Sequence, residues 1–275
     1  LRDAVVRTAV AAVLGLMAGA LLLPPVLILG PVGWLLAGLT AVAAAGLLLW
    51  AQPRVIAPLF NRFRPLEQGA LRTRLETMIA RCGARAESMF VMDGSRRSGQ
   101  ANAYFSGFGR AKRVVLFDTL IEDLDDNEIE AVLAHELGHD CEGHFRRHYA
   151  LLGILLLCAV LVIGVAGSFA ILAALGVPAS AAAWLAAGFL LWPRLAWPLQ
   201  PWLAARLRRY EFEADAFAAR HADAHALVSA LKRLLAHNAA SLRVDPLYAA
   251  FHASHPPPEQ RLAALESIGA QWGEM

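Results

Sequence analysis

The chain has 275 residues, of which 57% are hydrophobic and only 17% are charged, and its formal net charge is +2. This composition lies outside the usual range of a soluble domain and indicates a membrane protein. The net charge says little about partners. The apolar composition makes the lipid bilayer an expected partner, and no nucleic acid is expected among the partners. The three cysteines are an odd number and lie far apart, so no disulfide framework is expected.

Two long gaps between charged side chains predict membrane-spanning helices. No acidic or basic side chain lies between Arg7 and Arg54, nor between His148 and Arg194, over about 45 residues each time. Each gap is long enough for two spans of roughly 20 residues. Prolines and glycines interrupt both gaps, so we expect about four transmembrane helices in two hairpins.

The arginines predict on which side of the membrane the polar segments lie. Residues 54–147 and the residues after Arg194 are Arg-rich, whereas the hairpin turns carry no charge. By the positive-inside rule, both polar segments are expected in the cytoplasm. The chain begins with Leu1 rather than Met, so we also expect a natural N-terminal part to be missing.

Short runs of β-type residues follow between residues 87 and 118. They lie at 89–92, 103–105 and 114–117 and are separated by turns that contain Asp and Gly. We predict a small antiparallel sheet beside the next helix. An extended peptide can bind such a sheet as an added strand, which makes Ala103, Tyr104 and Phe105 candidate substrate contacts, with an ordinary structural hairpin as the alternative.

A helix with two metal-binding side chains is predicted after this sheet. Asp125 and Glu128 form a capping-box pattern before an apolar-periodic run. His135 and His139 lie four residues apart, hence on one face of the helix, where both imidazoles can bind one zinc ion. Glu136 points about a quarter turn away, where it can reach a water molecule at the metal and act as a general base.

The other side of this helix is predicted to be buried. Ile129, Val132, Leu133 and Leu137 form an apolar stripe at helical spacing. Gly138 costs roughly 1 kcal/mol relative to Ala inside a helix. We therefore expect another part of the protein to approach the backbone closely at Gly138.

A catalytic zinc ion needs a third protein ligand. The metzincin pattern fails, because Glu142 and Phe145 occupy the positions of its Gly and third His. Beyond Glu142 the next acidic residue is Glu211, which we predict to be the ligand in a thermolysin-like arrangement. Asp215, one turn later, is expected to orient a zinc-bound His through its other ring nitrogen. Glu213 is expected to be a solvated residue that balances nearby arginines.

The remaining histidines have no spacing that indicates a role. His255 precedes a run of prolines and has no role that composition can assign. The others are expected to be solvated or capping residues: His144, His148, His221, His225, His237 and His252.

Several motifs, taken together and in order, resemble the integral-membrane zinc CAAX prenyl endopeptidases (the CAAX prenyl protease 1 type), which cleave prenylated proteins after the modified Cys. The matching stretches are residues 55–61, 90–98, 102–105, 114–120, the His-Glu-x-x-His motif with its lead-in, 211–217 and 254–257. The resemblance implies a helical membrane enzyme around a water-filled chamber. Zinc would be bound by the residues that match His135, His139 and Glu211, with Glu136 as the base.

The resemblance also assigns residues that spacing could not assign. Asn102 and His255 match positions that bind the oxyanion of the tetrahedral intermediate. Asp215 and Arg261 match supporting positions near the zinc. The chain departs from the family at Gln100, where His is common, and in its number of spans, since the family has seven helices. A further departure is Leu207, where Ser is common.

We therefore expect a mainly α, polytopic helical membrane protein with a zincin-like cytoplasmic metalloprotease domain that carries a small antiparallel β-sheet. The expected parts are a transmembrane hairpin (1–52), a cytoplasmic zincin segment with the sheet and zinc helix (53–147), a second transmembrane hairpin (148–200), and a cytoplasmic segment with the third ligand and C-terminal helix (201–275). The expected activity is that of a zinc metalloendopeptidase with one Zn²⁺ per chain. Its expected substrate is a peptide or protein, prenylated if the chain shares the family's specificity.

The expected location is a bacterial inner membrane, with the active site facing the cytoplasm. Two alternative functions stay open. Membrane heat-shock proteases share the zinc and Glu-x-x-x-Asp pattern with about four spans, and they cleave misfolded membrane proteins. In another class, the chain could be a non-catalytic membrane scaffold with a structural zinc, although such sites are usually closed by four protein ligands.

Overall fold

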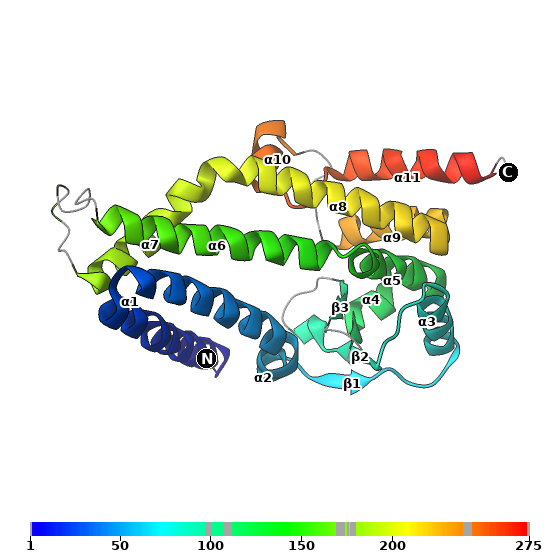
Figure 1. Ribbon diagram of the computed structural model, residues 1–275. Coiled ribbons are helices and arrows are strands. Elements are labelled where there is room, and N and C mark those ends of the chain that lie inside the picture. Colours follow the sequence, from blue (N-terminus) through cyan, green and yellow to red (C-terminus); the bar gives the residue numbers. More distant parts are fainter. Residues whose placement is uncertain are drawn as a thin grey trace. The chain divides into compact units, whose positions relative to one another are not determined.

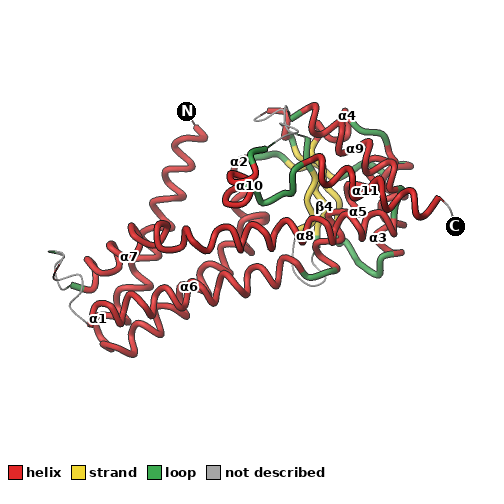
Figure 2. Tube along the Cα trace, turned by 90° about the horizontal axis from the view of Figure 1, so that it is seen from above, coloured by secondary structure: helices red, strands yellow, loops and turns green. Residues whose placement is uncertain are grey.

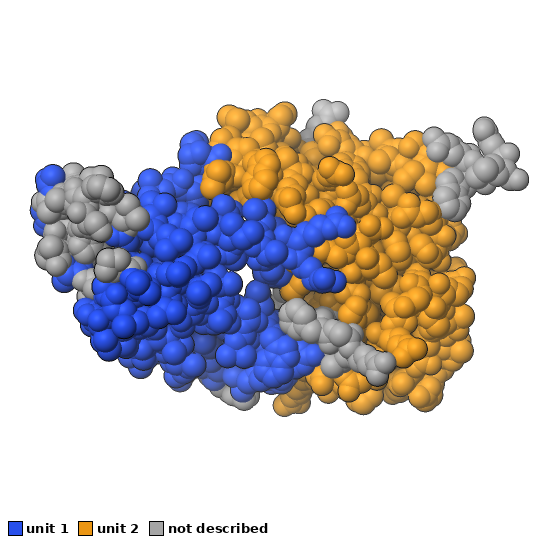
Figure 3. Space-filling model, in the orientation of Figure 1, with its two compact units in different colours: residues 1–60, 146–198 blue, residues 61–145, 199–275 orange. Residues whose placement is uncertain are grey.

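The computed structural model describes residues 2–96, 101–106, 112–168, 174, 176, 180–238 and 244–273. The described chain is mainly helical and contains one small sheet (Figure 1). It divides into two compact units, residues 1–60 with 146–198, and residues 61–145 with 199–275 (Figure 3). We call these the helical unit and the sheet unit. The departure at Gln100 falls outside the described residues.

The helical unit consists of long apolar helices. In chain order its elements are α1 (Arg2–Ala51), a π-helical turn (Gln52–Ile56), α2 (Ala57–Phe60), α6 (His144–Ser168, which begins in the sheet unit), α7 (Ala181–Ala196) and a 3-10 turn (Trp197–Leu199). α1 is interrupted at Gly30, whose φ of 53° is left-handed. Gly38 lies against Leu157 and Gly164 lies against Trp34, so glycines let α1 and α6 approach closely.

Three stretches of the described residues are long and apolar enough to cross a membrane: Val5–Gly30, Val32–Phe60 and His144–Gly164. The first two fall in the region of the predicted first hairpin (1–52), although the second extends to Phe60. The expected fourth span coincides with α7, which has 16 residues, fewer than the roughly 20 that a span needs. Residues 177–179, just before α7, are outside the described part.

The sheet unit combines four strands with seven helices in the described residues. Its elements are β1 (Phe63–Pro65), α3 (Ala70–Arg81), β2 (Ser88–Met92), a 3-10 turn (Gly94–Arg96), β3 (Ala103–Ser106), β4 (Arg113–Phe117), α4 (Asp118–Asp123), α5 (Asp126–Cys141), α8 (Gln200–His221), α9 (Ala224–His237), α10 (Pro246–His252) and α11 (Pro258–Gly273).

The sheet, whose strands are yellow in Figure 2, is mixed. Its strand order is β1-β2-β4-β3. β1 pairs with β2, and β3 pairs with β4, in antiparallel fashion, whereas β2 and β4 are parallel. The expectation of a purely antiparallel sheet was therefore wrong. In sequence, β3 lies between β2 and β4. Because β3 runs antiparallel to both, the chain enters β4 in the same direction as β2, and these two strands are parallel. β3 is the outer strand on that side of the sheet.

α5 is the central helix of the sheet unit. It begins with the predicted capping box, in which Oδ1 of Asp125 accepts from the backbone N–H of Glu128 at 3.0 Å, while Oε2 of Glu128 accepts from the N–H of Asp125 at 3.0 Å. The predicted apolar stripe is buried. α5 packs against α3, α8, α9 and β3. These contacts place one helix of the core, α5, next to both α8 and the outer strand of the sheet.

Candidate metal centre

Three side chains from two helices converge on one point in the sheet unit. His135 and His139 lie one turn apart on α5, and Glu211 lies on α8. The two Nε2 atoms are 3.2 Å apart, while Oε2 of Glu211 is 3.7 Å from Nε2 of His135 and Oε1 is 3.4 Å from Nε2 of His139. The structure thus brings the three predicted ligands together.

These distances fit a zinc ion. Nitrogen and oxygen ligands that lie about 2.0–2.1 Å from a tetrahedral zinc ion are about 3.3 Å from one another. Two imidazoles and one carboxylate are also the donor set of a catalytic zinc that keeps its fourth position open. His135, His139 and Glu211 therefore suit a catalytic site better than a closed structural one.

The close approach of α5 and α8 depends on Gly138. A Cβ atom at this position would lie 3.1 Å from Cα of Ala214 and 3.1 Å from Cβ of Phe217. The backbone of α8 is therefore the neighbour that the sequence predicted for Gly138. Because Ala214 lies between Glu211 and Asp215 on α8, the same contact sets the distance between the His pair and these two acids.

Asp215 and Arg261 form a charged pair behind His135. Oδ1 of Asp215 lies 2.8 Å from Nδ1 of His135, the nitrogen that faces away from the other ligands. Nε and Nη2 of Arg261 donate to the two oxygens of Asp215 at 2.8 and 2.6 Å. Burial alone would raise the pKa of Asp215, but its contacts with His135 and Arg261 lower it. Asp215 therefore stays ionised and can hold a proton on Nδ1 of His135, which leaves Nε2 available to a metal.

Glu136 is partly buried beside the ligands. Burial raises the pKa of its carboxyl above the usual value, while His135 and His139 act in the opposite direction. A carboxylate with a raised pKa is a stronger base than an exposed one. The helix therefore supplies a proton acceptor next to the three converging side chains.

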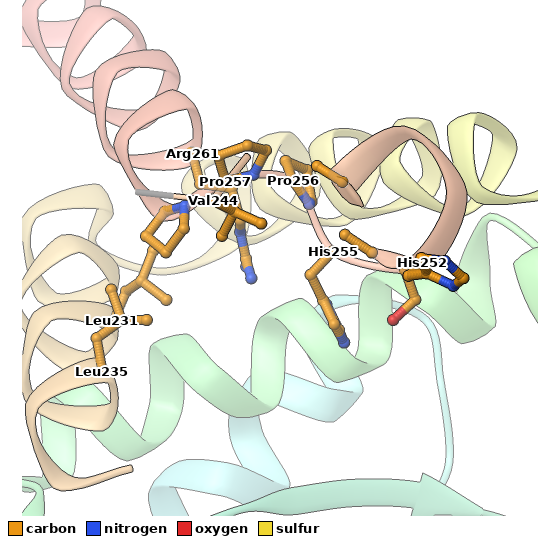
Figure 4. A pocket seen from close by; sticks show the side chains of 12 residues that line it. Leu231, Leu235, Val244, His252, His255, Pro256, Pro257 and Arg261 are labelled. Carbon is orange, nitrogen blue, oxygen red and sulfur yellow. The ribbon is translucent and has the colours of Figure 1, made fainter. Parts of the chain in front are cut away.

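His255 approaches the centre from the turn between α10 and α11. Its Nδ1 lies 2.7 Å from Oε2 of Glu211, and Nη1 of Arg261 lies 3.3 Å from the same oxygen. Burial would raise the pKa of Glu211, but its contacts with His139 and His255 lower it. Both His255 and Arg261 also line an apolar pocket of about 430 Å³ (Figure 4). His255 thus lies at the border between a pocket and the metal centre, although its position before three prolines gave no sign of this.

Arg208 fixes the end of the helix that leads to His255. Its Nη1 donates to the backbone carbonyls of Ala249 and Ala253, at 2.8 and 3.0 Å. Ala249 lies in the last turn of α10 and Ala253 is its C-terminal cap, so Arg208 holds the C-terminal end of this helix. This role of Arg208 was not predicted from the sequence. The only available signal was its position three residues before Glu211 of the Glu-x-x-x-Asp motif.

Asn102 lies immediately before β3 and is exposed. Its Oδ1 accepts from the backbone N–H of Ala103 at 2.8 Å. Among the contacts of the described residues, this side chain has none with the three ligands. Its predicted part in binding an oxyanion stays a prediction.

The predicted substrate edge is the outer strand β3. Ala103 is buried, the ring of Tyr104 packs edge-on against Phe117, and Lys112 lies over the ring of Phe105. Burial raises the pKa of Tyr104 to about 12. β3 pairs with β4 on one side and packs against α5, the helix of the metal centre.

The expectation that His144 is solvated was wrong, whereas Glu213 does balance an arginine, because its Oε1 lies 2.7 Å from Nε of Arg209. His144 is only 2% exposed, and its Nδ1 lies 3.1 Å from Nδ1 of His139. Its Nε2 lies 2.9 Å from Oε2 of Glu213. His144 stacks on the ring of Tyr210, at a centroid distance of 4.2 Å. Both residues thus belong to the surroundings of a predicted ligand.

The fold and the site together define a helical membrane protein with a zinc-protease type of metal centre. The sequence model of Peptidase family M48 matches residues 65–269. The chain belongs to this family, and it is an integral membrane protein with helical spans.

Known proteins agree with this assignment. The chain is 38% identical to a CAAX prenyl protease 1 homolog of Oryza sativa subsp. japonica, over 80% of this chain and 52% of that protein. It is 30% identical to the Homo sapiens homolog over 98% of this chain and 65% of that protein. The crystal structure of S. mikatae Ste24p superimposes with a TM-score of 0.86 at 29% identity, covering 96% of this chain and 65% of that one. The chain thus spans about half the length of its plant relatives.

Proposed function

We propose that this chain is a membrane-embedded zinc metalloendopeptidase with one zinc ion, and that its substrates are prenylated CAAX-type proteins. The observation that carries the proposal is the convergence of His135, His139 and Glu211 next to the partly buried Glu136. The names of the relatives support the substrate class. The arginine-rich polar segments support an active site on the cytoplasmic side of the membrane.

Each residue of the site has a separate role in the proposed reaction. Zinc, when bound, supplies Lewis acidity that acidifies a water molecule and polarises the scissile carbonyl. Glu136 accepts the proton of the attacking water and returns it to the leaving amine. Asp215 keeps the proton of His135 on Nδ1, and Arg261 keeps Asp215 ionised.

Substrate is held by two further parts of the sheet unit. The outer strand β3 pairs with the extended peptide through its outer edge, at Ala103, Tyr104 and Phe105. Asn102 and His255 donate to the oxyanion. A well-placed donor of this kind contributes about 3 kcal/mol to the stability of the transition state.

Peptidase assays on the full chain in detergent test the proposal. A farnesylated CAAX peptide, the same peptide without its farnesyl group, and casein are incubated with the chain, with and without a zinc chelator. We expect faster cleavage of the farnesylated peptide and loss of cleavage with chelator. Preference for casein would replace the substrate class by that of a quality-control protease. Zinc binding without any cleavage would indicate a scaffold.

Glu136→Gln tests the general base. This variant keeps the shape of the side chain but cannot accept the proton, so we expect zinc binding to persist and kcat to fall by about 10²- to 10⁴-fold. Glu142→Gln is the matched control, because Glu142 lies at the end of the same helix, and its ion-pair partner is Arg220 at 4.0 Å. Cleavage by Glu136→Gln at the parental rate would show that Glu136 is not the base.

A further inference from the structure

His144 is a buried histidine that the proposed chemistry does not use. It follows Gly143, whose φ of +68° ends α5 and turns the chain back toward His139. In this position Nδ1 of His144 faces Nδ1 of His139 at 3.1 Å, and Nε2 of His144 faces Oε2 of Glu213 at 2.9 Å. The other oxygen of Glu213 accepts from Nε of Arg209 at 2.7 Å. A chain of polar contacts therefore leads from a zinc ligand to an ion pair.

One arrangement of protons satisfies the contacts of His144 with His139 and with Glu213. His139 presents Nε2 to the metal, so its ring proton lies on Nδ1. That proton is donated to Nδ1 of His144, which must then be the bare nitrogen of a neutral ring. The proton of His144 lies on Nε2 and is donated to Glu213, which accepts as a carboxylate. The stacked ring of Tyr210, inclined by 12°, fixes the plane of His144.

We propose that His144 and Glu213 are positioning residues for the zinc ligand His139. They do for His139 what Asp215 does for His135, whose Nδ1 lies 2.8 Å from the carboxylate. The inference rests on the proposed zinc site, but it concerns the metal affinity and the geometry of the site. His144 is not itself a ligand, because its Nδ1 faces Nδ1 of His139 and not Nε2, the nitrogen that binds the metal.

Metal binding by variants of His144 tests this role. His144→Phe keeps the stacked ring but removes the acceptor for His139, whereas His144→Asn keeps an acceptor oxygen near the position of Nδ1. We expect His144→Phe to bind zinc about 10- to 100-fold more weakly in a chelator competition, and His144→Asn to recover most of that loss. With Co²⁺ in place of zinc, the visible d–d spectrum of His144→Phe should differ from that of the parent.

His221→Phe is the matched control. Like His144, His221 stacks on an aromatic ring, that of Phe217, and it contacts the backbone carbonyl of that residue. We expect its zinc affinity and cobalt spectrum to equal those of the parent. Parental values for His144→Phe, in a chain that is folded, would overturn the proposal.

Glu213→Ala tests the outer member of the chain at a side chain that is 29% exposed, where a change is tolerated even if His144→Phe fails to fold. We expect a smaller loss of zinc affinity than for His144→Phe, and no additional loss in the double variant, because Glu213 acts on His139 only through His144. Additive losses would overturn the coupled role. A parent chain that binds zinc but cleaves no peptide would refute the proposed function and leave this role of His144 supported.

Discussion

Arg261 is the residue on which the charge balance of the metal centre depends. It contacts both oxygens of Asp215 and one oxygen of Glu211, and these two carboxylates are buried. Burying two carboxylates close together is unfavourable unless a cation compensates them. The planar guanidinium can bond both acids at once, whereas a lysine ammonium is a single point charge.

We predict that Arg261→Met lowers the free energy of unfolding by about 3–5 kcal/mol, because it leaves buried charge without compensation. Arg261→Lys should lower the free energy of unfolding less, by about 1–3 kcal/mol, since the lysine ammonium can keep one of the contacts that the guanidinium makes with the two acids. Denaturant unfolding in detergent measures both. Lys232→Met is the control, because the pair of Lys232 with Glu266 is exposed and should contribute less than about 1 kcal/mol. Equal losses for Arg261→Met and Lys232→Met would contradict the prediction.

Among the elements, the contact of α5 with α8 determines the metal centre. The two histidines come from one helix and Glu211 comes from the other, and the backbones of the two helices are in close contact where Gly138 meets Ala214. A side chain inserted there separates the ligands as well as the helices. Stability and metal affinity are therefore linked at this one position.

We predict that Gly138→Ala destabilises the chain although alanine favours helix by about 1 kcal/mol. The added Cβ would meet backbone atoms of α8 at 3.1 Å, and overpacking of this kind costs about 1–3 kcal/mol. Zinc affinity should fall with the melting temperature. Gly269→Ala in α11 is the control, because its Cβ would meet no atom closer than 3.6 Å, and it should stabilise. A gain in stability for Gly138→Ala would contradict the prediction.

Local patterns in the sequence were sufficient to predict α5. The capping box of Asp125 and Glu128, the buried stripe and the close neighbour of Gly138 are all confirmed. The strands at 89–92, 103–105 and 114–117 also exist, since β-branched and aromatic residues favour strands through their local fit to a pleated, half-buried surface. Their pairing was not predictable in the same way, because the path of the connections decides whether β2 and β4 are parallel.

The contacts of His144 could not be predicted from the spacing of residues in the sequence. Gly143 ends the helical register after His139, so a count of residues no longer tells which side chains share a face. The partner Glu213 lies 69 residues further along the chain. Its neighbour in the motif, Asp215, was identified because a single helical turn relates it to Glu211.

At the scale of the whole molecule, the metal centre is assembled from two segments that are far apart in sequence. His135 and His139 come from residues 61–145, and Glu211 comes from residues 199–275, while the residues between them belong to the helical unit. α6, which leaves the sheet unit, begins a candidate membrane span at His144. The proposed orientation requires that both segments of the sheet unit lie on the cytoplasmic side.

We predict that Cys141 is modified by a membrane-impermeant maleimide in inside-out vesicles but not in intact cells of a bacterial expression host. Cys141 is exposed at the end of α5, and replacing Cys82 and Cys158 by Ser leaves it as the only thiol. Leu29→Cys in a cysteine-free background is the control, because Leu29 is exposed next to Gly30, where the two candidate spans of α1 meet. It should show the opposite pattern. Modification of Cys141 in intact cells would reverse the orientation and place the metal centre outside the cytoplasm.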